Sequence, residues 1–194
     1  MNRLFSAKDL INIGIFTVLY MVVLAVFGQL GALVPILQVL GPLYIPLLGG
    51  IPFMLFATRV RHFGMVTVMG WLTGLLVLAT GQSYWVALFA IVLAPAADAV
   101  LRLGDYRQPV WLVLGYAIFS EMLIGTVVPL FIARDAFLER LGRRHDQGWI
   151  DSLVALTPSW VFWVMIAELA VGAAAGAYLG RATLRKHFER AGVA

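Results

Sequence analysis

The stretch LINIGIFTVLYMVVLAVFG, residues 10–28, contains no charged side chain. A helix needs about 20 apolar residues to cross the hydrocarbon core of a bilayer, so this stretch predicts a transmembrane helix. Ser6 and Asp9 precede it with the spacing of a capping box, which indicates where the helix starts. The whole chain shares this character, because 62% of its 194 residues are hydrophobic and only 12% are charged. We therefore expect one integral membrane domain, residues 1–194.

Further apolar stretches of similar length follow the first one. Polar or Gly/Pro-rich connections separate them, and each is long enough, or nearly so, to span a bilayer. The predicted fold class is an all-α membrane protein with six transmembrane helices. These are expected at about 10–28, 32–57, 63–81, 83–103, 109–133 and 155–180.

The basic residues predict the orientation of these helices. Lys and Arg in short loops are retained on the cytoplasmic side of a membrane, so we place both termini on that side. This use of the basic residues accounts for the pI of about 9.8 without a nucleic-acid partner. The residues expected inside are Arg3, Lys8, Arg59, Arg61, Arg102, Arg107, Arg181, Arg185, Lys186 and Arg190.

Residues 29–50 are unusually rich in proline and glycine. Proline removes a helical N–H donor and clashes with the preceding turn, so a simple straight helix is not expected here. Broken backbone at membrane depth is tolerated where it is buried in protein or lines a wet cavity. We interpret this segment either as an outer loop and broken helix that caps a binding pocket, or as a kinked helix shaped only by packing.

Three acidic residues, Asp98, Glu121 and Glu168, lie inside the apolar stretches, where a charge costs at least ~2.5 to 3.5 kcal/mol. Asp98 precedes Arg102 by one helical turn, which predicts a local ion pair. Glu121 and Glu168 are expected near mid-membrane depth. They either share a proton, contact a ligand, make a polar contact between helices, or stay neutral through desolvation.

Aromatic residues gather toward the predicted outer side, among them Trp85, Trp160 and Trp163. Tryptophan commonly anchors helices at the membrane interface, whereas inward-facing rings would form flat apolar walls for a ligand. Polar groups are expected at the same level, at Gln29, Gln38, Gln82, Thr157 and Ser159.

Glycines at small-residue spacing lie in two of the predicted helices. Gly70 and Gly74 form a GxxxG pair, and a second stripe contains Gly172, Gly176 and Gly180. Such stripes let helix backbones approach closely in a membrane. They serve either internal packing or a groove for a separate membrane subunit.

The signatures of common membrane enzymes are missing from the sequence. There is no HExxH, no GxxxxGK[ST] and no GxSxG pattern, and the histidines fall in separate polar segments. There is no cysteine to serve as a nucleophile or metal ligand. We therefore expect no catalytic residues, no metal site and no cofactor.

Several strings resemble the MptD or Trep_Strep group, whose members are identified as substrate-binding S components of energy-coupling factor (ECF) transporters. They follow the group's order along nearly the whole chain. The strings are KDLINIGIFTVLY at 8–20, GGIPFMLFATRVRHFG at 49–64, PLFIARDAFLE at 129–139, LTPSW at 156–160 and RKHFERAGVA at 185–194.

The resemblance implies an S-component-like bundle that captures a vitamin or other micronutrient from outside. It would join a transmembrane coupling subunit and two cytoplasmic ATPases, then topple in the membrane to release its cargo. S components often contact the coupling subunit through an AxxxA stripe on the first helix, and the matching positions here are Gly14 and Val18. Valine departs from that pattern.

The sequence thus predicts an outward cavity between the 29–50 segment and the outer halves of the last three spans. A solitary secondary transporter, with Glu121 or Glu168 as a proton relay, and a membrane enzyme remain alternatives. Candidate substrate contacts are Gln38, Trp85, Glu121, Arg134, Trp160 and Trp163; candidate partner-docking residues are Gly14, Val18, Gly70 and Gly74.

Overall fold

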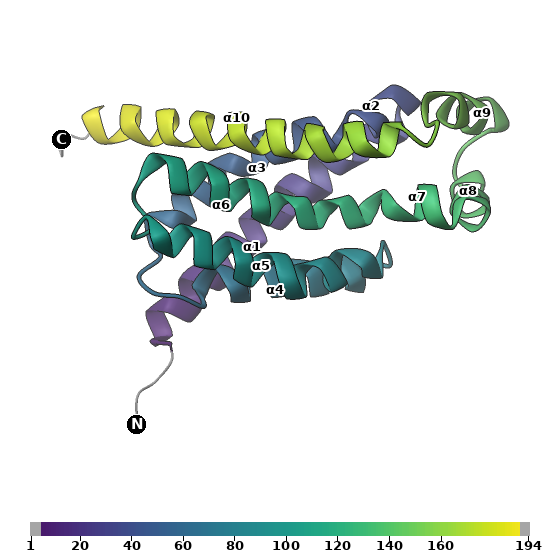
Figure 1. Ribbon diagram of the computed structural model, residues 1–194. Helices are drawn as coiled ribbons and strands as arrows, with labels where there is room; N and C mark the ends of the chain where they lie inside the picture. The colour runs from purple at the N-terminus through teal and green to yellow at the C-terminus, as the bar shows by residue number, and fades with distance from the viewer. Residues whose placement is uncertain (1–4, 191–194) are drawn as a thin grey trace.

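In the computed structural model, all regular elements of the described residues are helices, packed as an elongated bundle (Figure 1). The structure describes residues 5–190, with side chains placed up to Leu184, so Arg3, Arg185, Lys186 and Arg190 of the predicted orientation signal lie outside the described side chains. The elements are α1 (Ala7–Gly28), η1 (Gln29–Ala32), α2 (Pro35–Val39), α3 (Gly41–Ala57), α4 (Met65–Ala79), α5 (Tyr84–Leu103), α6 (Pro109–Glu121), η2 (Met122–Thr126), α7 (Val128–Ile132), α8 (Arg134–Gly142), α9 (Gln147–Leu156) and α10 (Val161–Arg190).

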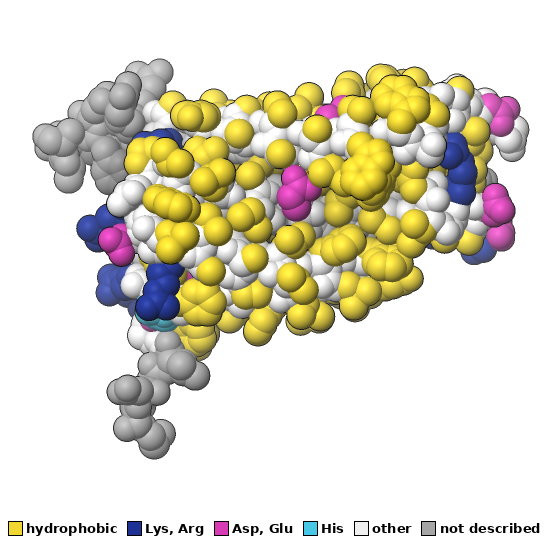
Figure 2. Space-filling view, in the orientation of Figure 1, with side chains coloured by type: hydrophobic (Ala, Val, Ile, Leu, Met, Phe, Trp, Pro, Cys, Tyr) yellow, Lys and Arg dark blue, Asp and Glu magenta, His cyan; other side chains and the backbone are white. Residues whose placement is uncertain are grey.

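The bundle has two chemically different ends. Helix α1 begins and α10 ends at one of them, on the left in Figure 1, which we call the terminal end. Helices α8 and α9 form the opposite end, which we call the α8–α9 end. Hydrophobic side chains cover the visible side of the molecule between these ends, whereas most Lys, Arg, Asp and Glu lie at them (Figure 2).

The predicted all-helical membrane class is confirmed. Four segments of the described chain are long and apolar enough to cross a membrane, namely Ala7–Ala32, Tyr84–Leu103, Pro109–Thr126 and Val161–Leu184. Two further apolar helices, α3 and α4, have 17 and 15 residues. The predicted limits at 63–81 and 83–103 agree closely with α4 and α5.

The last two predicted spans have different limits in the structure. The span expected at 109–133 is interrupted after Glu121 by the 3-10 segment η2 and continues as the short helix α7. The span expected at 155–180 begins only at Val161, because a turn at 157–160 separates it from α9, which packs across the bundle end. A hydropathy profile alone does not reveal these helix breaks, because the residues on both sides of each break are apolar.

The proline-rich segment is broken in its first half only. Short helices η1 and α2 replace a continuous helix up to Leu40, as predicted, but α3 runs unbroken through Pro46 and Pro52. Each internal proline removes one helical N–H donor. Extra support for the backbone comes from α6, where the Tyr116 hydroxyl donates to the Pro46 carbonyl at 2.7 Å. The expectation that the break extends to residue 50 is therefore wrong.

Helices α3 and α10 approach each other through glycine. A Cβ added to Gly176 would lie 2.5 Å from the Pro46 carbonyl oxygen and 2.6 Å from that of Leu47, and Gly172 and Gly180 face the same α3 backbone. Real Cβ atoms do not tolerate such distances to backbone atoms. The glycine stripe of α10 thus serves internal packing, which is one of the two uses that its spacing predicted.

A helix of the same chain also packs against the GxxxG pair of α4. A Cβ on Gly74 would lie 3.0 Å from the Ala87 Cα of α5, and Gly70 packs directly against Ala94 of the same helix. The structure assigns Gly70 and Gly74 to an internal helix contact, so we do not retain them as partner-docking residues.

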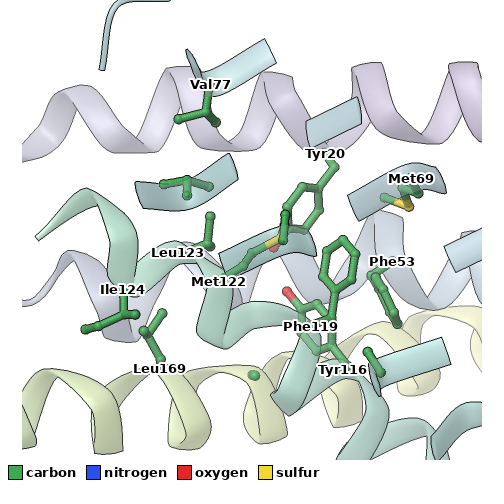
Figure 3. Close-up of a cluster of buried hydrophobic side chains, with 14 of the residues drawn as sticks. Tyr20, Phe53, Met69, Val77, Tyr116, Phe119, Met122, Leu123, Ile124 and Leu169 are labelled. Atoms are coloured by element: carbon green, nitrogen blue, oxygen red, sulfur yellow. The ribbon is translucent and has the colours of Figure 1, made fainter. Parts of the chain in front are cut away.

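Aromatic side chains fill the centre of the bundle (Figure 3). Tyr20 of α1, Phe53 of α3 and both Tyr116 and Phe119 of α6 converge there, and all four are fully buried. The Phe53 ring lies 4.5 Å from the Tyr116 ring and 4.8 Å from the Phe119 ring, within the usual range of aromatic pairs. We call these four side chains the aromatic plug.

Candidate functional site

A cavity of about 490 Å³ opens at the α8–α9 end of the bundle. This volume lies in the range of small-molecule sites, roughly 300 to 1,000 Å³. Its walls come from α1, α3, α4 and η2, and it lies beneath the broken η1–α2 segment and helix α8. The apolar walls include Met21, Leu24, Leu37, Ile45, Val77, Leu123, Val127, Phe137, Leu141 and Leu169.

The broken segment is held over the cavity by two specific contacts. The Tyr44 hydroxyl lies 3.2 Å from the carbonyl oxygens of both Phe27 and Leu37, to either of which it can donate, so it ties the end of α1 and α2 to α3. Gly31 lies directly against the Gln38 side chain, where a Cβ has no room. These contacts explain why the backbone breaks here without exposing its polar groups to lipid.

Neutral polar side chains lie among the apolar residues of the cavity walls. Gln29, Gln38, Gln82, Thr80 and Thr126 all line the cavity. The three glutamines among them were expected at this level from the sequence. Amides and hydroxyls placed in an otherwise apolar cavity orient a ligand and give it specificity.

Ser83 is a further polar residue of the cavity wall. It is only 5% exposed, and its hydroxyl has no hydrogen-bond partner among the described residues. Ser83 is the N-cap residue of α5, yet its side chain makes no capping bond. A buried hydroxyl without a partner costs about 1–3 kcal/mol. The oxygen itself is buried, so Ser83 contributes to the cavity wall without presenting its hydroxyl to the cavity.

Basic groups of α8 and the following turn form one side of the cavity. Arg140, Arg144 and His145 line it, and the described lining contains no carboxylate. Arg140 donates to the backbone carbonyl of Gln82 at 3.0 Å, which fixes α8 against the turn between α4 and α5. The site therefore favours a ligand with an apolar body and a group that is anionic or accepts hydrogen bonds.

Of the six predicted substrate contacts, only Gln38 lines this cavity. Trp85 stacks on Tyr84 at 5.1 Å and packs against the core from the side of α5. Trp160 and Trp163 are 64% and 69% exposed, so they lie on the outer surface, where tryptophan anchors helices at the membrane interface.

Arg134 has a structural role in the α8–α9 corner. Its guanidinium donates to the Thr157 carbonyl at 2.9 Å, to the Val154 carbonyl at 3.1 Å and to the Thr157 hydroxyl at 3.1 Å. These bonds satisfy carbonyls that the C-terminus of α9 leaves free. Arg134 therefore bonds to residues of its own chain and lies outside the cavity.

Glu121 and Glu168 also lie outside the cavity, both half-buried on the neighbouring helices α6 and α10. No hydrogen bond or ion pair joins either side chain to another described residue, and Oε2 of Glu168 is a buried atom without a partner. Figure 2 shows acidic side chains within the apolar surface of the bundle. The structure does not bring the two carboxylates to the floor of the cavity.

The predicted ion pair between Asp98 and Arg102 is not formed. Oδ2 of Asp98 instead accepts from the backbone N–H of Gly64 and of Thr67, each at 2.9 Å, and from the Thr67 hydroxyl at 3.0 Å. Gly64 is the N-cap residue of α4 and has no side chain to cap it. Asp98 of α5 therefore supplies the N-cap that α4 lacks, and a carboxylate suits the positive end of a helix dipole.

The other carboxylate oxygen of Asp98 accepts from the Tyr106 hydroxyl at 2.8 Å. Burial raises the pKa of this hydroxyl, and its hydrogen bond to Asp98 raises it further, so it remains a protonated donor. Tyr106 and Asp105 both have positive φ, 56° and 49°. Their strained backbone is held in place because Tyr106 is bound to Asp98.

The surface of α1 around Gly14 and Val18 is free in this structure. Val18 is 59% exposed, and a Cβ on Gly14 would meet no atom within 4 Å. Ile11, Ile15 and Val22 continue the same exposed apolar face.

The Trep_Strep family model, described as a hypothetical bacterial integral membrane protein, matches residues 7–190. The chain belongs to this family. The match confirms the family that the sequence strings predicted, together with the integral membrane class. No curated protein and no solved structure matches the chain significantly.

Sequence reasoning missed Ser83, Tyr44 and the basic group at Arg140, Arg144 and His145. Ser83 looks like an ordinary helix cap, and only its lack of a capping bond distinguishes it. One signal was available, since several of these residues lie in the same predicted outer connections as the glutamines.

Proposed function

We propose that this Trep_Strep protein is a substrate-capture subunit, the S component of an ECF-type importer in the bacterial inner membrane. In this proposal six helices cross the membrane, both termini are cytoplasmic, and the α8–α9 end faces outward. The observation that carries the proposal is the cavity at that end, closed by a broken segment and lined by apolar walls with a few polar groups.

The cavity chemistry narrows the cargo to a small amphiphile. Its apolar body would contact side chains such as Leu24 and Val127, and a hydrogen-bonding group would meet the side-chain amides of Gln29 and Gln38. A carboxylate or phosphate would lie near Arg140 and Arg144, because the described lining offers no competing acidic group. A vitamin or another micronutrient with an anionic group has this character.

The remaining parts of the importer would come from other chains. The sequence contains no nucleotide-binding motif, so transport energy would come from two ATPases through a coupling subunit. The exposed face of α1 around Gly14 and Val18 is the docking surface that we propose for that subunit. We favour a binding subunit over an enzyme because the cavity collects amides, hydroxyls and guanidinium groups, without a nucleophile and base in contact.

The direct test is to purify the full chain from cells grown in rich medium and identify any co-purified small molecule by mass spectrometry. We expect one anionic or hydrogen-bonding amphiphile, retained at least tenfold less by Gln38→Ala. Ser152→Ala on the exposed face of α9 is the matched control and retains it fully. Repeated isolation without any bound compound would contradict the proposal.

Uptake measurements separate the capture subunit from a solitary transporter. Vesicles that contain the chain together with the coupling subunit and ATPases should accumulate the identified compound when ATP is supplied. Vesicles that contain the chain alone should bind it without accumulation. Accumulation by the chain alone, lost in Glu121→Gln or Glu168→Gln, would favour the proton-coupled alternative instead.

A further inference from the structure

A second and larger cavity, of about 1130 Å³, lies at the terminal end of the bundle. It is enclosed by the end of α3, the connection from α3 to α4, the connection from α5 to α6, and the α10 helix near Leu184. No residue of the described lining is shared with the cavity at the α8–α9 end, so this cavity is separate from the proposed substrate site.

Four arginines line this second cavity: Arg61, Arg102, Arg107 and Arg181. They come from the α3–α4 connection, α5, the α5–α6 connection and α10, so only the fold brings them together. Figure 2 shows Lys and Arg side chains gathered at this end.

The charges of these arginines are largely uncompensated within the described part of the chain. The ion pairs found there join Asp9 to His62 and Glu139 to Arg143, and none includes the four arginines. None of their guanidinium groups donates a hydrogen bond to a described residue, and Asp105 is the one carboxylate in the lining. Converging positive charges create a potential that attracts an anion.

The remaining walls are apolar. Met54, Ala57, Val60 and Leu112 are buried at the inner surface, and Phe63 and Leu184 continue the lining. A free inorganic ion would leave this apolar surface unused. An anionic head attached to a hydrocarbon chain would contact both the arginines and the apolar walls.

The position of the cavity fits such a ligand. It lies where the apolar surface of the bundle gives way to the charged end, which is the level of lipid headgroups in a membrane. Basic pockets between transmembrane helices at the cytoplasmic side bind the headgroups of anionic lipids. Guanidinium groups also match phosphate oxygens in geometry.

We propose that this terminal-end cavity is a binding site for the phosphate headgroup of an anionic phospholipid, with Arg61, Arg102, Arg107 and Arg181 as its cationic ligands. The site does not depend on the proposed transport function. A protein with no cargo at the α8–α9 end would still bind lipid here.

The test uses the full chain in detergent and native mass spectrometry with phosphatidylglycerol and phosphatidylcholine of the same acyl chains. We expect phosphatidylglycerol to be retained at least tenfold more than phosphatidylcholine. The double variant Arg102→Gln/Arg107→Gln should lower phosphatidylglycerol retention about 30-fold, since each basic group near a membrane surface contributes about 1 kcal/mol to binding of anionic lipid.

Arg143→Gln is the matched control. It removes an exposed arginine at the opposite end, where the side chain pairs with Glu139, and should leave retention unchanged. Equal retention of the two lipids, or equal loss in the control and the double variant, would overturn the proposal. Displacement of phosphatidylglycerol by millimolar inorganic phosphate would also overturn it, because phosphate alone would then be the ligand.

Discussion

The capping of α4 by Asp98 is the structural feature whose loss should be most damaging. The carboxylate is fully buried, and it accepts the hydrogen bonds of two backbone N–H groups, one threonine hydroxyl and one tyrosine hydroxyl. Asp98→Ala removes all four acceptor contacts. It leaves the N–H groups of Gly64 and Thr67 without partners at the start of α4.

The magnitude follows from these orphaned donors. Each buried polar group left without a partner costs about 1–3 kcal/mol, which applies to the N–H and the hydroxyl of Thr67; the partly buried N–H of Gly64 costs less. We expect Asp98→Ala to lower the free energy of unfolding by about 4 kcal/mol. Asp98→Asn should cost only about 1–2 kcal/mol, because its amide oxygen still accepts from α4, although without the charge that strengthens such bonds.

Equilibrium unfolding of the purified protein in mixed micelles, titrated with SDS and followed by tryptophan fluorescence, measures these differences. Arg102→Gln serves as the control, because Arg102 makes no ion pair with Asp98 and should cost less than 1 kcal/mol. If Arg102→Gln destabilised the protein as much as Asp98→Ala, the local ion pair would be the true role of Asp98. The capping argument would then be refuted.

Three further predictions follow from packing, hydrogen bonding and topology. Gly176→Val should lower the free energy of unfolding by about 1–3 kcal/mol or more in the same assay, because a Cβ there meets backbone oxygens of α3. An unchanged unfolding midpoint would contradict the close α3–α10 contact. Arg134→Ala removes the hydrogen bonds from Arg134 to Thr157 and should loosen the α8–α9 corner. Amide hydrogen exchange in α9 should then become at least tenfold faster. Unchanged exchange would contradict the structural role of Arg134. The chain has no cysteine, so single variants report topology directly: Ser152→Cys should react with an impermeant maleimide outside intact cells, and Asp105→Cys only after lysis. The reverse pattern would invert the proposed orientation.

Much of the bundle was predictable from local composition. The predicted spans at 63–81 and 83–103 agree with α4 and α5, and the break after residue 28 was expected from its prolines and glycines. The predictions failed at Pro46 and Pro52, which the helix α3 includes without a break. They also failed at the end of α9, because apolar residues on both sides of the turn at 157–160 conceal it.

The candidate site was less predictable than the fold. Gln38 lines the cavity, but Trp160 and Trp163 face outward. The sequence around the two tryptophans does not distinguish an inward-facing side chain from an outward-facing one. Helices that are apolar on every side have no polar face to mark which residues point inward. Ser83 was missed for a related reason, since an unused helix cap looks the same in sequence as a used one.

The sequence by itself determined that this is a helical membrane protein, where α4 and α5 begin and end, and which family it belongs to. Those properties depend on runs of neighbouring residues and on strings such as LTPSW at 156–160. Only the tertiary structure decided what the buried polar residues do. Asp98 caps a helix that starts more than thirty residues earlier in the chain, and four separate connections and helices bring their arginines to one cavity. Such roles depend on which helices pack together, and in a membrane that is set by the close fit of small residues and by hydrogen bonds, since lipid provides no hydrophobic drive to choose between faces.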